Sequence, residues 1–373
     1  KEFLLKVKSI CLKNYRNYDN AEVEFADAFN IIYGNNAQGK TNIIEAIFLC
    51  ASGRSHRTPK DNELLKYGKN FFDIKLEYSR ADRNEQIHIV YSNEERKKIS
   101  INDIPLKKIG GLMGHLNAVI FSPEDLLVIK QGPAERRRFI DITLSQLRPS
   151  YFFDLQQYAK ILLQRNNLLK SISLNNELAD TLEVWDHHLV KTGARIMKAR
   201  KDFIKRLDVM AAARHEKLTN CEEKLRLEYD PSFKIEETDE EEKIEDAFRR
   251  NIRKNREKEL MKGTTLTGPQ RDDIDIILNG ESTRIYASQG QQRTSVLSMK
   301  LAEIDIMKEE TGEYPVLLLD DVLSELDDRR KEYLLDSIDE IQTLITSTDK
   351  RFFSRNSDGS AFFHVESGII RRE

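Results

Sequence analysis

The sequence predicts an α/β fold in which a mixed central sheet with flanking helices is joined to a helical lobe. Residues 29–33 form a short apolar run that leads through a glycine-rich segment into the apolar residues 41–51, in the order strand, turn, helix. Residues 314–319 form a second apolar run with the composition of a parallel strand that is buried on both faces. The helical lobe is predicted by residues 151–218, where apolar side chains recur at heptad spacing.

The glycine-rich segment reads Gly34-Asn35-Asn36-Ala37-Gln38-Gly39-Lys40-Thr41. It fits the phosphate-binding loop pattern G-x-x-x-x-G-K-[S/T] at every fixed position. The two glycines let backbone N–H groups curl around phosphate oxygens, and the helix N-terminus adds partial positive charge. Lys40 can reach the β- and γ-phosphates, and the Thr41 hydroxyl can coordinate Mg²⁺. The segment therefore predicts that the chain binds a nucleoside triphosphate.

Two carboxylates, Asp320 and Asp321, follow the apolar run 314–319. At the C-terminal end of a parallel strand, Asp320 is expected to face the phosphate loop and hold Mg²⁺, while Asp321 polarises the attacking water. Acidic turn residues after a strand are common, but beside a phosphate loop they predict the second half of a catalytic site. Lys40, Asp320 and Asp321 are therefore the predicted catalytic residues, and Thr41 and Asp320 are the predicted metal ligands.

A second helix start suited to an anion lies at Ser288-Gln289-Gly290-Gln291. Ser288 is a natural N-cap, and Gly290 leaves the backbone open to an approaching anion. One nucleotide does not need two such helix starts in one chain. The segment resembles the signature motif of the ATP-binding-cassette superfamily, in which the motif caps the γ-phosphate held by the opposite subunit. Residues 324–327 resemble the dimer-contacting loop of that superfamily.

Further matching segments occupy residues 10–18, 53–57, 121–126 and 267–273. Together these motifs resemble the RecF family of bacterial recombination mediators, within the ABC/SMC/Rad50-like ATPase superfamily. The resemblance implies an ABC-type P-loop ATPase head that uses ATP and Mg²⁺. It also implies an ATP-driven homodimer that clamps DNA, released by slow, DNA-stimulated hydrolysis. The resemblance alone also implies a role in DNA repair, replication-fork maintenance, recombination and the SOS response. It further implies recombinase loading at single-strand gaps, a preference for gapped or junction DNA and a RecR-like partner.

Four positions depart from the family pattern. Gln289 stands where the signature usually has glycine, and Asp321 stands where most relatives have glutamate. No glutamine occurs within residues 121–124, where a Gln loop is expected, and Ser347 occupies the place of the switch histidine. These departures predict slow turnover, which suits a switch better than a motor.

Three segments are predicted along the chain. Residues 1–105 carry the N-terminal part of the ATPase lobe, residues 106–262 form a mainly helical lobe, and residues 263–373 carry the signature and the acidic pair. The helical hairpin predicted within 151–218 is either a stub of a coiled-coil arm or an ordinary helical subdomain. The acidic run 236–242 predicts the start of another, solvated helix. Other expected elements are strands at 71–78, 86–91, 97–101, 116–121, 343–346 and 361–365, a helix at 133–147, and a hairpin of strands 273–278 and 282–286.

Composition narrows the class of protein. The 373 residues carry a formal net charge of −3, so DNA binding must use a local basic surface and is expected to be independent of sequence. The candidates are Arg54, His56, Arg57 and Lys60, although Arg54 and Arg57 could instead brace the site or pair with local acids. No apolar run reaches ~18 residues, so no membrane span is expected. The three cysteines match neither a disulfide framework nor a metal site, which predicts a cytoplasmic protein.

Two other classes of protein share the phosphate loop. One is a Rad50-like ATPase subunit of a nuclease complex, but the chain lacks a long coiled coil and a Cys-x-x-Cys hook. The other is a transporter cassette, which the long insertion and the absent Gln loop disfavour.

Overall fold

The computed structural model describes residues 5–81, 83–172, 180–235, 240–348 and 359–373. The chain divides into two compact units. The first comprises Lys1–Asp125 and Lys300–Glu373, and the second comprises Leu126–Met299.

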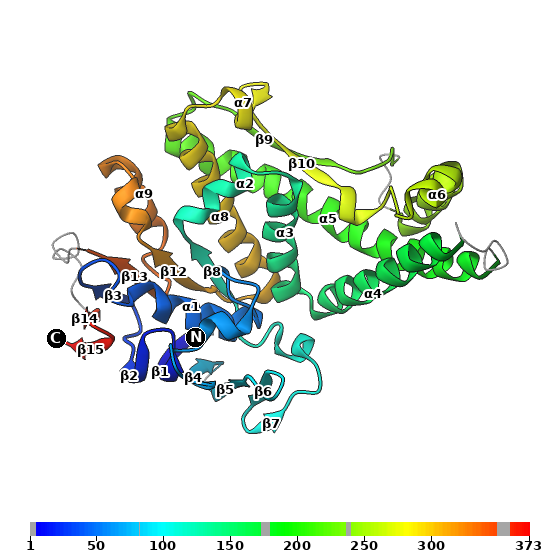
Figure 1. Ribbon diagram of the computed structural model, residues 1–373. Coiled ribbons are helices and arrows are strands. Elements are labelled where there is room, and N and C mark those ends of the chain that lie inside the picture. The colour runs from blue at the N-terminus through cyan, green and yellow to red at the C-terminus, as the bar shows by residue number, and fades with distance from the viewer. Residues whose placement is uncertain (1–4, 82, 173–179, 236–239, 349–358) are drawn as a thin grey trace. The chain divides into compact units, whose positions relative to one another are not determined.

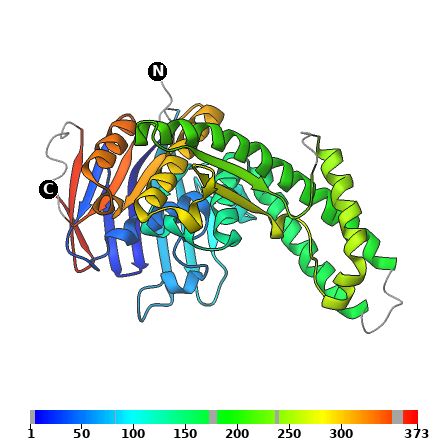
Figure 2. The same ribbon diagram turned by 90° about the horizontal axis from the view of Figure 1, so that it is seen from above.

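A six-stranded, mostly parallel sheet forms the core of the first unit. Its order is β15 (Ile369–Arg372), β14 (Ala361–Glu366), β3 (Phe29–Tyr33), β13 (Thr343–Ser347), β12 (Val316–Asp320) and β8 (Ala118–Phe121). The strands from β14 to β8 are parallel, and β15 runs antiparallel at one edge (Figure 2). The segments β3, β13 and β12 are far apart in the sequence but lie side by side (Figure 1). Because the middle strands are almost entirely buried, the predicted apolar core strands and the mixed sheet are confirmed.

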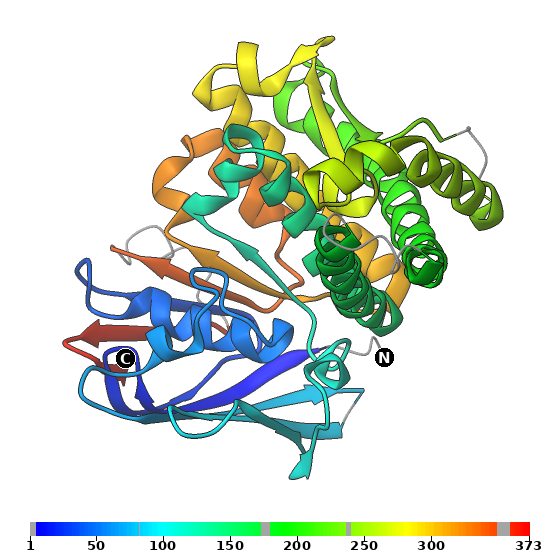
Figure 3. The same ribbon diagram turned by 45° about the vertical axis from the view of Figure 1, so that its right-hand side comes forward.

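An antiparallel sheet completes the first unit. Its order is β2 (Tyr18–Glu24), β1 (Lys6–Tyr15), β4 (Phe71–Arg80), β5 (Arg83–Ser92), β6 (Lys98–Ile101) and β7 (Ile104–Pro105). Helix α1 (Lys40–Ser52) contacts strands of both sheets and lies over the antiparallel one (Figure 3). A helix covered on both sides must be apolar almost all round, which explains the run of buried residues in α1. The phosphate-loop helix is therefore fixed by two layers.

Helices dominate the second unit. They are α2 (Leu127–Lys130), α3 (Pro133–Leu147), α4 (Pro149–Ile172), α5 (Leu182–Thr219), α6 (Glu241–Lys262), α7 (Thr283–Tyr286) and the first part of α8 (Gln289–Thr311). Helices α4 and α5 pack together as the predicted hairpin, and α5 also packs against α6. The heptad residues Leu182, Leu189, Ile196 and Phe203 are buried, as the spacing predicts. None of the helices in the described part of the chain combines the length and hydrophobicity that a membrane span requires.

A small antiparallel sheet belongs to the second unit and changes two predictions. Its order is β11 (Glu281–Ser282), β10 (Asp273–Leu278) and β9 (Leu225–Asp230). The strand predicted at 282–286 is wrong after Ser282, because α7 replaces it. Gln292 Nε2 donates to the carbonyl oxygens of Thr283 and Ala287, so this segment wraps around the start of α8.

The boundary predicted at 262 also differs from the observed division. Strand β10 pairs along its length with β9, and this pairing keeps residues beyond 262, including the Ser288 segment, in the second unit. Of the acidic run 236–242, residues 236–239 lie outside the described residues, and α6 begins at Glu241.

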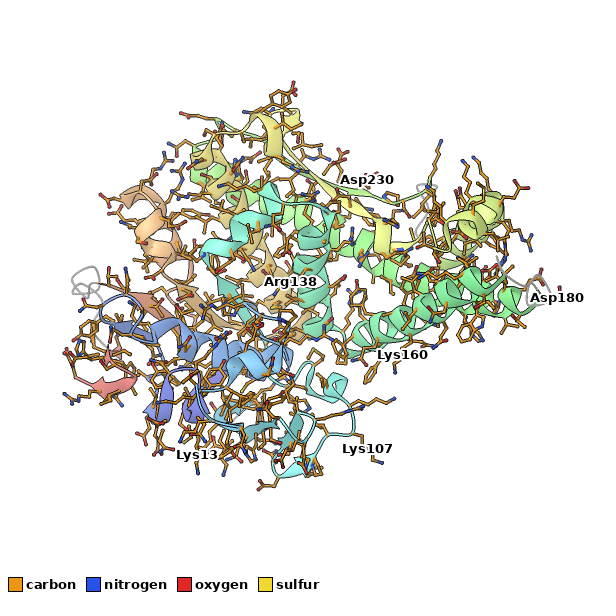
Figure 4. The ribbon with its side chains drawn as sticks, in the orientation of Figure 1. Lys13, Lys107, Arg138, Lys160, Asp180 and Asp230 are labelled. Carbon is orange, nitrogen blue, oxygen red and sulfur yellow. The ribbon has the colours of Figure 1, made fainter. Side chains whose placement is uncertain are left out.

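The family-like segment 267–273 has a packing role in the second unit. Asp273 accepts two hydrogen bonds from the guanidinium of Arg136, at 2.6 and 2.8 Å. The backbone carbonyl of Asp272 accepts a hydrogen bond from Arg137 at 2.6 Å. Of these three consecutive arginines on α3, Arg138 has the exposed side chain (Figure 4).

A buried arginine links the three long helices of the second unit. The Arg165 side chain on α4 is completely inaccessible to solvent. Its guanidinium donates to Asp186 Oδ1 on α5, to Thr265 Oγ1 and to Glu259 Oε2 on α6, each at 2.7 Å. Since Glu259 is also fully buried, each charge needs the other to replace lost water.

We expect Arg165→Ala to lower the free energy of unfolding by about 3–5 kcal/mol, because Glu259 keeps a buried charge without its cation. Urea denaturation followed by the fluorescence of Trp185, the only tryptophan in the chain, measures the change in this unit. Lys160→Ala is the control, because Lys160 is exposed on the same helix (Figure 4) and should alter the free energy by less than about 0.5 kcal/mol. A loss below about 1 kcal/mol in Arg165→Ala contradicts the expectation.

Candidate functional site

The glycine-rich loop lies between the buried strand β3 and helix α1, as predicted. Gly34 and Gly39 have positive φ angles of 150° and 116°. A Cβ atom on Gly34 would lie 2.3 Å from the carbonyl oxygen of Val365, and one on Gly39 would lie 2.4 Å from Asn17 Nδ2. Both positions therefore require glycine, because a Cβ atom at either would collide with a neighbouring atom.

Lys40 is almost completely buried in this loop. Its ammonium donates hydrogen bonds to the carbonyl oxygens of Gly34, at 2.8 Å, and of Asn35, at 3.0 Å. Burial lowers the pKa of Lys40, and the charges of Asp321 and Asp320 act in the opposite direction. A partly desolvated ammonium held only by carbonyl oxygens of the loop can exchange these partners for an incoming phosphate.

Asp320 lies at the end of β12, where its side chain is buried against two hydroxyl groups. Its Oδ1 accepts hydrogen bonds from Thr41 Oγ1 at 2.8 Å and from Thr346 Oγ1 at 2.7 Å. Thr346 is the direct neighbour of Asp320 in the parallel pairing of β12 with β13. Burial raises the pKa of Asp320, while the hydrogen bonds from Thr346 and Thr41 lower it. A buried carboxylate beside a hydroxyl is the oxygen donor set that Mg²⁺ prefers, so these residues fit the predicted metal.

Asp321 has a left-handed backbone conformation, with φ at 53°. Its N–H donates to Thr346 Oγ1 at 2.9 Å, so Thr346 holds both acidic residues. Within the described residues its carboxylate makes neither a hydrogen bond nor an ion pair, and the residue is partly exposed. Aspartate tolerates the left-handed region better than most residues, which gives a physical reason for the short acid at this position.

The turn between β1 and β2 holds the phosphate loop from outside. Asn17 Nδ2 donates to the carbonyl oxygen of Gln38 at 2.7 Å, and the Tyr18 hydroxyl donates to that of Gly39 at 3.0 Å. Asn17 Oδ1 also accepts from Asn42 Nδ2 at 2.8 Å. The motif analysis identified this turn only as part of the family-like segment 10–18, without a role for its side chains.

Glu45 on α1 is a fully buried acid that sequence analysis missed. Arg16 binds it through two nitrogens, at 2.8 and 2.6 Å, and the Ser55 hydroxyl donates to it at 2.5 Å. Although burial by itself favours the protonated acid, hydrogen bonds from Arg16 and Ser55 hold the pKa of Glu45 below its usual value. A buried glutamate in a helix after a phosphate loop, with arginines on both sides in the sequence, is the signal that could have revealed this cluster.

The four residues proposed to contact DNA have different surroundings. Arg57 lies 3.6 Å from Glu45 and donates to Asn42 at 3.2 Å, which matches the alternative of a bracing role. His56 packs edge-on against the ring of Phe48. Arg54 is exposed, and Lys60 is exposed beside Glu63 at 3.5 Å. Arg57 is exposed as well, but its contacts with Glu45 and Asn42 leave Arg54 and Lys60 as the exposed cations that are not engaged with the phosphate-loop helix.

Two acids follow β8 where a Gln loop is expected. Glu124 is exposed, and its charge contributes to the raised pKa of Asp320, which places it near that residue. Asp125 accepts a hydrogen bond from the backbone N–H of Ser122 at 2.7 Å and lies 3.8 Å from Lys300. Burial raises the pKa of Asp125 to about 6. The acidic edge of the sheet is thus larger than the predicted pair.

The signature-like segment begins α8 in the second unit. Gln291 N donates to Ser288 Oγ at 3.3 Å, and Ser288 N donates to Gln291 Oε1 at 2.8 Å. These reciprocal bonds form a capping box, which confirms the predicted N-cap. Ser288, Gln289 and Gly290 are exposed, so this helix start is accessible to a ligand.

Comparisons with known proteins agree with this geometry. The family model described as RecF/RecN/SMC N terminal domain matches residues 6–371. The DNA replication and repair protein RecF of Ruminiclostridium cellulolyticum is 52% identical over 366 residues, with 98% of each chain covered. That of Acetivibrio thermocellus is 53% identical over 363 residues, with 97% of this chain and 98% of the relative covered.

Solved structures of RecF are also similar to this chain. The structure of the recombination mediator protein RecF-ATP in the RecFOR pathway has a TM-score of 0.94 and 40% identity, and covers 100% of this chain and 99% of that chain. An Smc head domain from Pyrococcus furiosus, at a TM-score of 0.57 and 15% identity over 99% of this chain and 96% of that chain, is similar in fold alone. The chain therefore belongs to the RecF/RecN/SMC N-terminal domain family and, within it, to the RecF proteins.

Proposed function

We propose that this chain binds and slowly hydrolyses ATP, and that bound ATP joins two copies into a dimer that clamps DNA during recombinational repair. The observation that carries the proposal is the cluster of Thr41, Asp320 and Thr346, which joins the phosphate-loop helix to two core strands. The names of the relatives, which describe DNA replication and repair, and the ATP complex of a similar RecF protein support it.

Each site residue of the first unit has a defined role under this proposal. The backbone of residues 34–41 surrounds the phosphates, and Lys40 exchanges its carbonyl partners for phosphate oxygens. Thr41 and Asp320 would hold Mg²⁺, and the ion would neutralise charge on the phosphate oxygens. Asp321, whose carboxylate has no hydrogen-bonding partner in the described part of the chain, orients the attacking water.

The capped start of α8 supplies the other half of the site. In a dimer, Ser288, Gln289, Gly290 and Gln291 of one copy would face the γ-phosphate held by the other copy. Hydrolysis removes the phosphate that both copies hold, and the dimer then opens, which makes the nucleotide a switch. The short acid Asp321 is the reason for expecting slow turnover.

The assembly is proposed to act in the cytoplasm on gapped or junction DNA, where it would help to load recombinase together with a RecR-like partner. The RecFOR pathway named for a similar structure supports a partner of this kind. DNA contacts are proposed to be to the phosphate backbone, with Arg54 and Lys60 as the accessible candidates. His56 and Arg57 have packing and ion-pair contacts that limit such a role.

We expect Lys40→Ala to weaken ATP binding by about 10- to 100-fold, because a hydrogen bond to a charged group contributes about 1.5–3 kcal/mol. Titration of a fluorescent ATP analogue in the presence of Mg²⁺ measures the affinity. Lys107→Ala removes the same charge from an exposed position in the same unit (Figure 4) and should leave the affinity within about twofold. Equal affinity in both variants would rule out the phosphate-loop assignment.

Thr346→Val should slow ATP hydrolysis by about tenfold and leave ATP affinity within about twofold, since a hydrogen bond to a charged group is lost beside the reacting phosphate. The hydroxyl holds both Asp320 and the backbone of Asp321. Single-turnover phosphate release separates hydrolysis from binding. Thr343→Val is the matched control on the same strand, because among the described residues that hydroxyl bonds only to the carbonyl oxygen of Ile341. A Thr346→Val rate equal to that of the control would contradict this role.

Ser288→Asp should abolish ATP-driven dimerisation, because it sets a negative charge against the γ-phosphate while still capping the helix. Ser288→Asn caps the helix equally well without the charge, so it should dimerise within about threefold of the unmodified protein. Molar mass in solution with Mg²⁺, with and without ATP, gives the result. ATP-dependent dimers of Ser288→Asp would exclude the composite site.

A further inference from the structure

The second unit contains a buried histidine that the proposed chemistry does not use. His215 lies in the last turns of α5 and its side chain is completely inaccessible to solvent. Its Nδ1 lies 3.0 Å from Ser298 Oγ, and its Nε2 lies 3.1 Å from Glu223 Oε2. Both ring nitrogens are therefore held by polar groups inside the unit.

Glu223 connects this histidine to the capped start of α8. While one carboxylate oxygen contacts His215, the other accepts a hydrogen bond from Gln291 Nε2 at 2.9 Å. Both ends of the Gln291 amide then have a partner, because its Oε1 accepts a hydrogen bond from the backbone N–H of Ser288. The orientation of the amide in the capping box thus depends on Glu223.

The backbone places Glu223 beside the end of α5. Asn220 and Cys221 are two successive residues with positive φ angles, 53° and 62°, and they turn the chain back after α5. The N–H of Cys221 donates to the carbonyl oxygen of Glu216 at 2.8 Å, which fixes this reversal. Glu223 therefore returns alongside His215 in a defined position.

The partners of the histidine define which ring nitrogen donates to Glu223. The Glu223 carboxylate can only accept, so Nε2 of His215 carries the proton between them. Ser298 Oγ, which also lies 2.8 Å from the carbonyl oxygen of Thr294, is the hydrogen-bond partner of Nδ1. A hydrogen bond to a carboxylate is charge-assisted and stronger than a neutral one.

Glu223 and His215 contact helix α8 at two positions, Gln291 and Ser298. Gln291 lies at the cap, and Ser298 lies about two turns further along the same helix face. We propose that His215 and Glu223 are positioning residues that fix the start of α8 so that the Ser288–Gln291 cap can meet a phosphate. The contact with phosphate rests on the proposed function, whereas the positioning of the helix does not.

Glu223→Gln tests the inference, because glutamine has nearly the same shape as glutamate but replaces one acceptor oxygen by an NH₂ donor. A glutamine has one acceptor oxygen, but Gln291 Nε2 and His215 Nε2 both donate, so one of them meets an amide NH₂ instead. Hydrogen exchange of the backbone amides of Gln291 and Gln292, which donate to Ser288, should become about tenfold faster, and the ATP concentration for half-maximal dimerisation should rise by about tenfold. ATP affinity of the monomer should stay within about twofold, since the phosphate loop is unchanged.

Glu222→Gln is the matched control, because Glu222 is exposed and the change in charge is the same. The double exchange Glu223→Gln with Gln291→Glu restores every donor–acceptor pair, so protection of the amides at 291 and 292 should return to within about threefold of the unmodified protein. The inference is overturned if Glu223→Gln exchanges like Glu222→Gln, or if the double exchange restores no protection. An unmodified protein that fails to dimerise with ATP would reject the proposed function, while the exchange rates would still decide the positioning role.

Discussion

The buried carboxylate of Asp320 is the constraint on which the first unit depends. Removing a carboxylate from water is unfavourable unless hydrogen bonds replace the lost hydration. The hydroxyl groups of Thr41 and Thr346 supply these bonds from α1 and β13, at 2.8 and 2.7 Å. The phosphate-loop helix and the two strands must therefore keep one register for the carboxylate to be satisfied. The same arrangement presents oxygen donors to a cation.

The contacts that hold the phosphate loop use its carbonyl oxygens and leave its N–H groups for an anion. Asn17, Tyr18 and Lys40 all donate to carbonyl oxygens of the loop and do not occupy its N–H groups. They fix the loop without competing with an anion for its donors. The buried pair of Arg16 and Glu45 attaches the following helix to the same turn, so loop and helix are fixed by neighbouring side chains.

The start of α8 is also held by side-chain hydrogen bonds, although different residues supply them. Its capping box pairs the backbone N–H groups of Ser288 and Gln291 with side-chain oxygens, and Glu223 fixes the amide of Gln291 that closes the box. The Nε2–H of His215 gives the partly buried Glu223 carboxylate a hydrogen-bond donor. In each unit, a helix start is held by polar side chains from another part of the sequence.

The sequence by itself determined the elements that local patterns encode. The glycine positions of the loop, the Ser288 cap and the helix at 133–147 were predictable because glycine, capping residues and apolar periodicity act over a few residues. Tertiary structure alone decided the polar partners that lie outside the motifs. The motifs predicted that Thr41 and Asp320 share one site although they are 279 residues apart, whereas Thr346 reaches Asp320 only because β12 and β13 are neighbours in the sheet. Strand order is a property of the whole fold, so periodicity cannot reveal such partners.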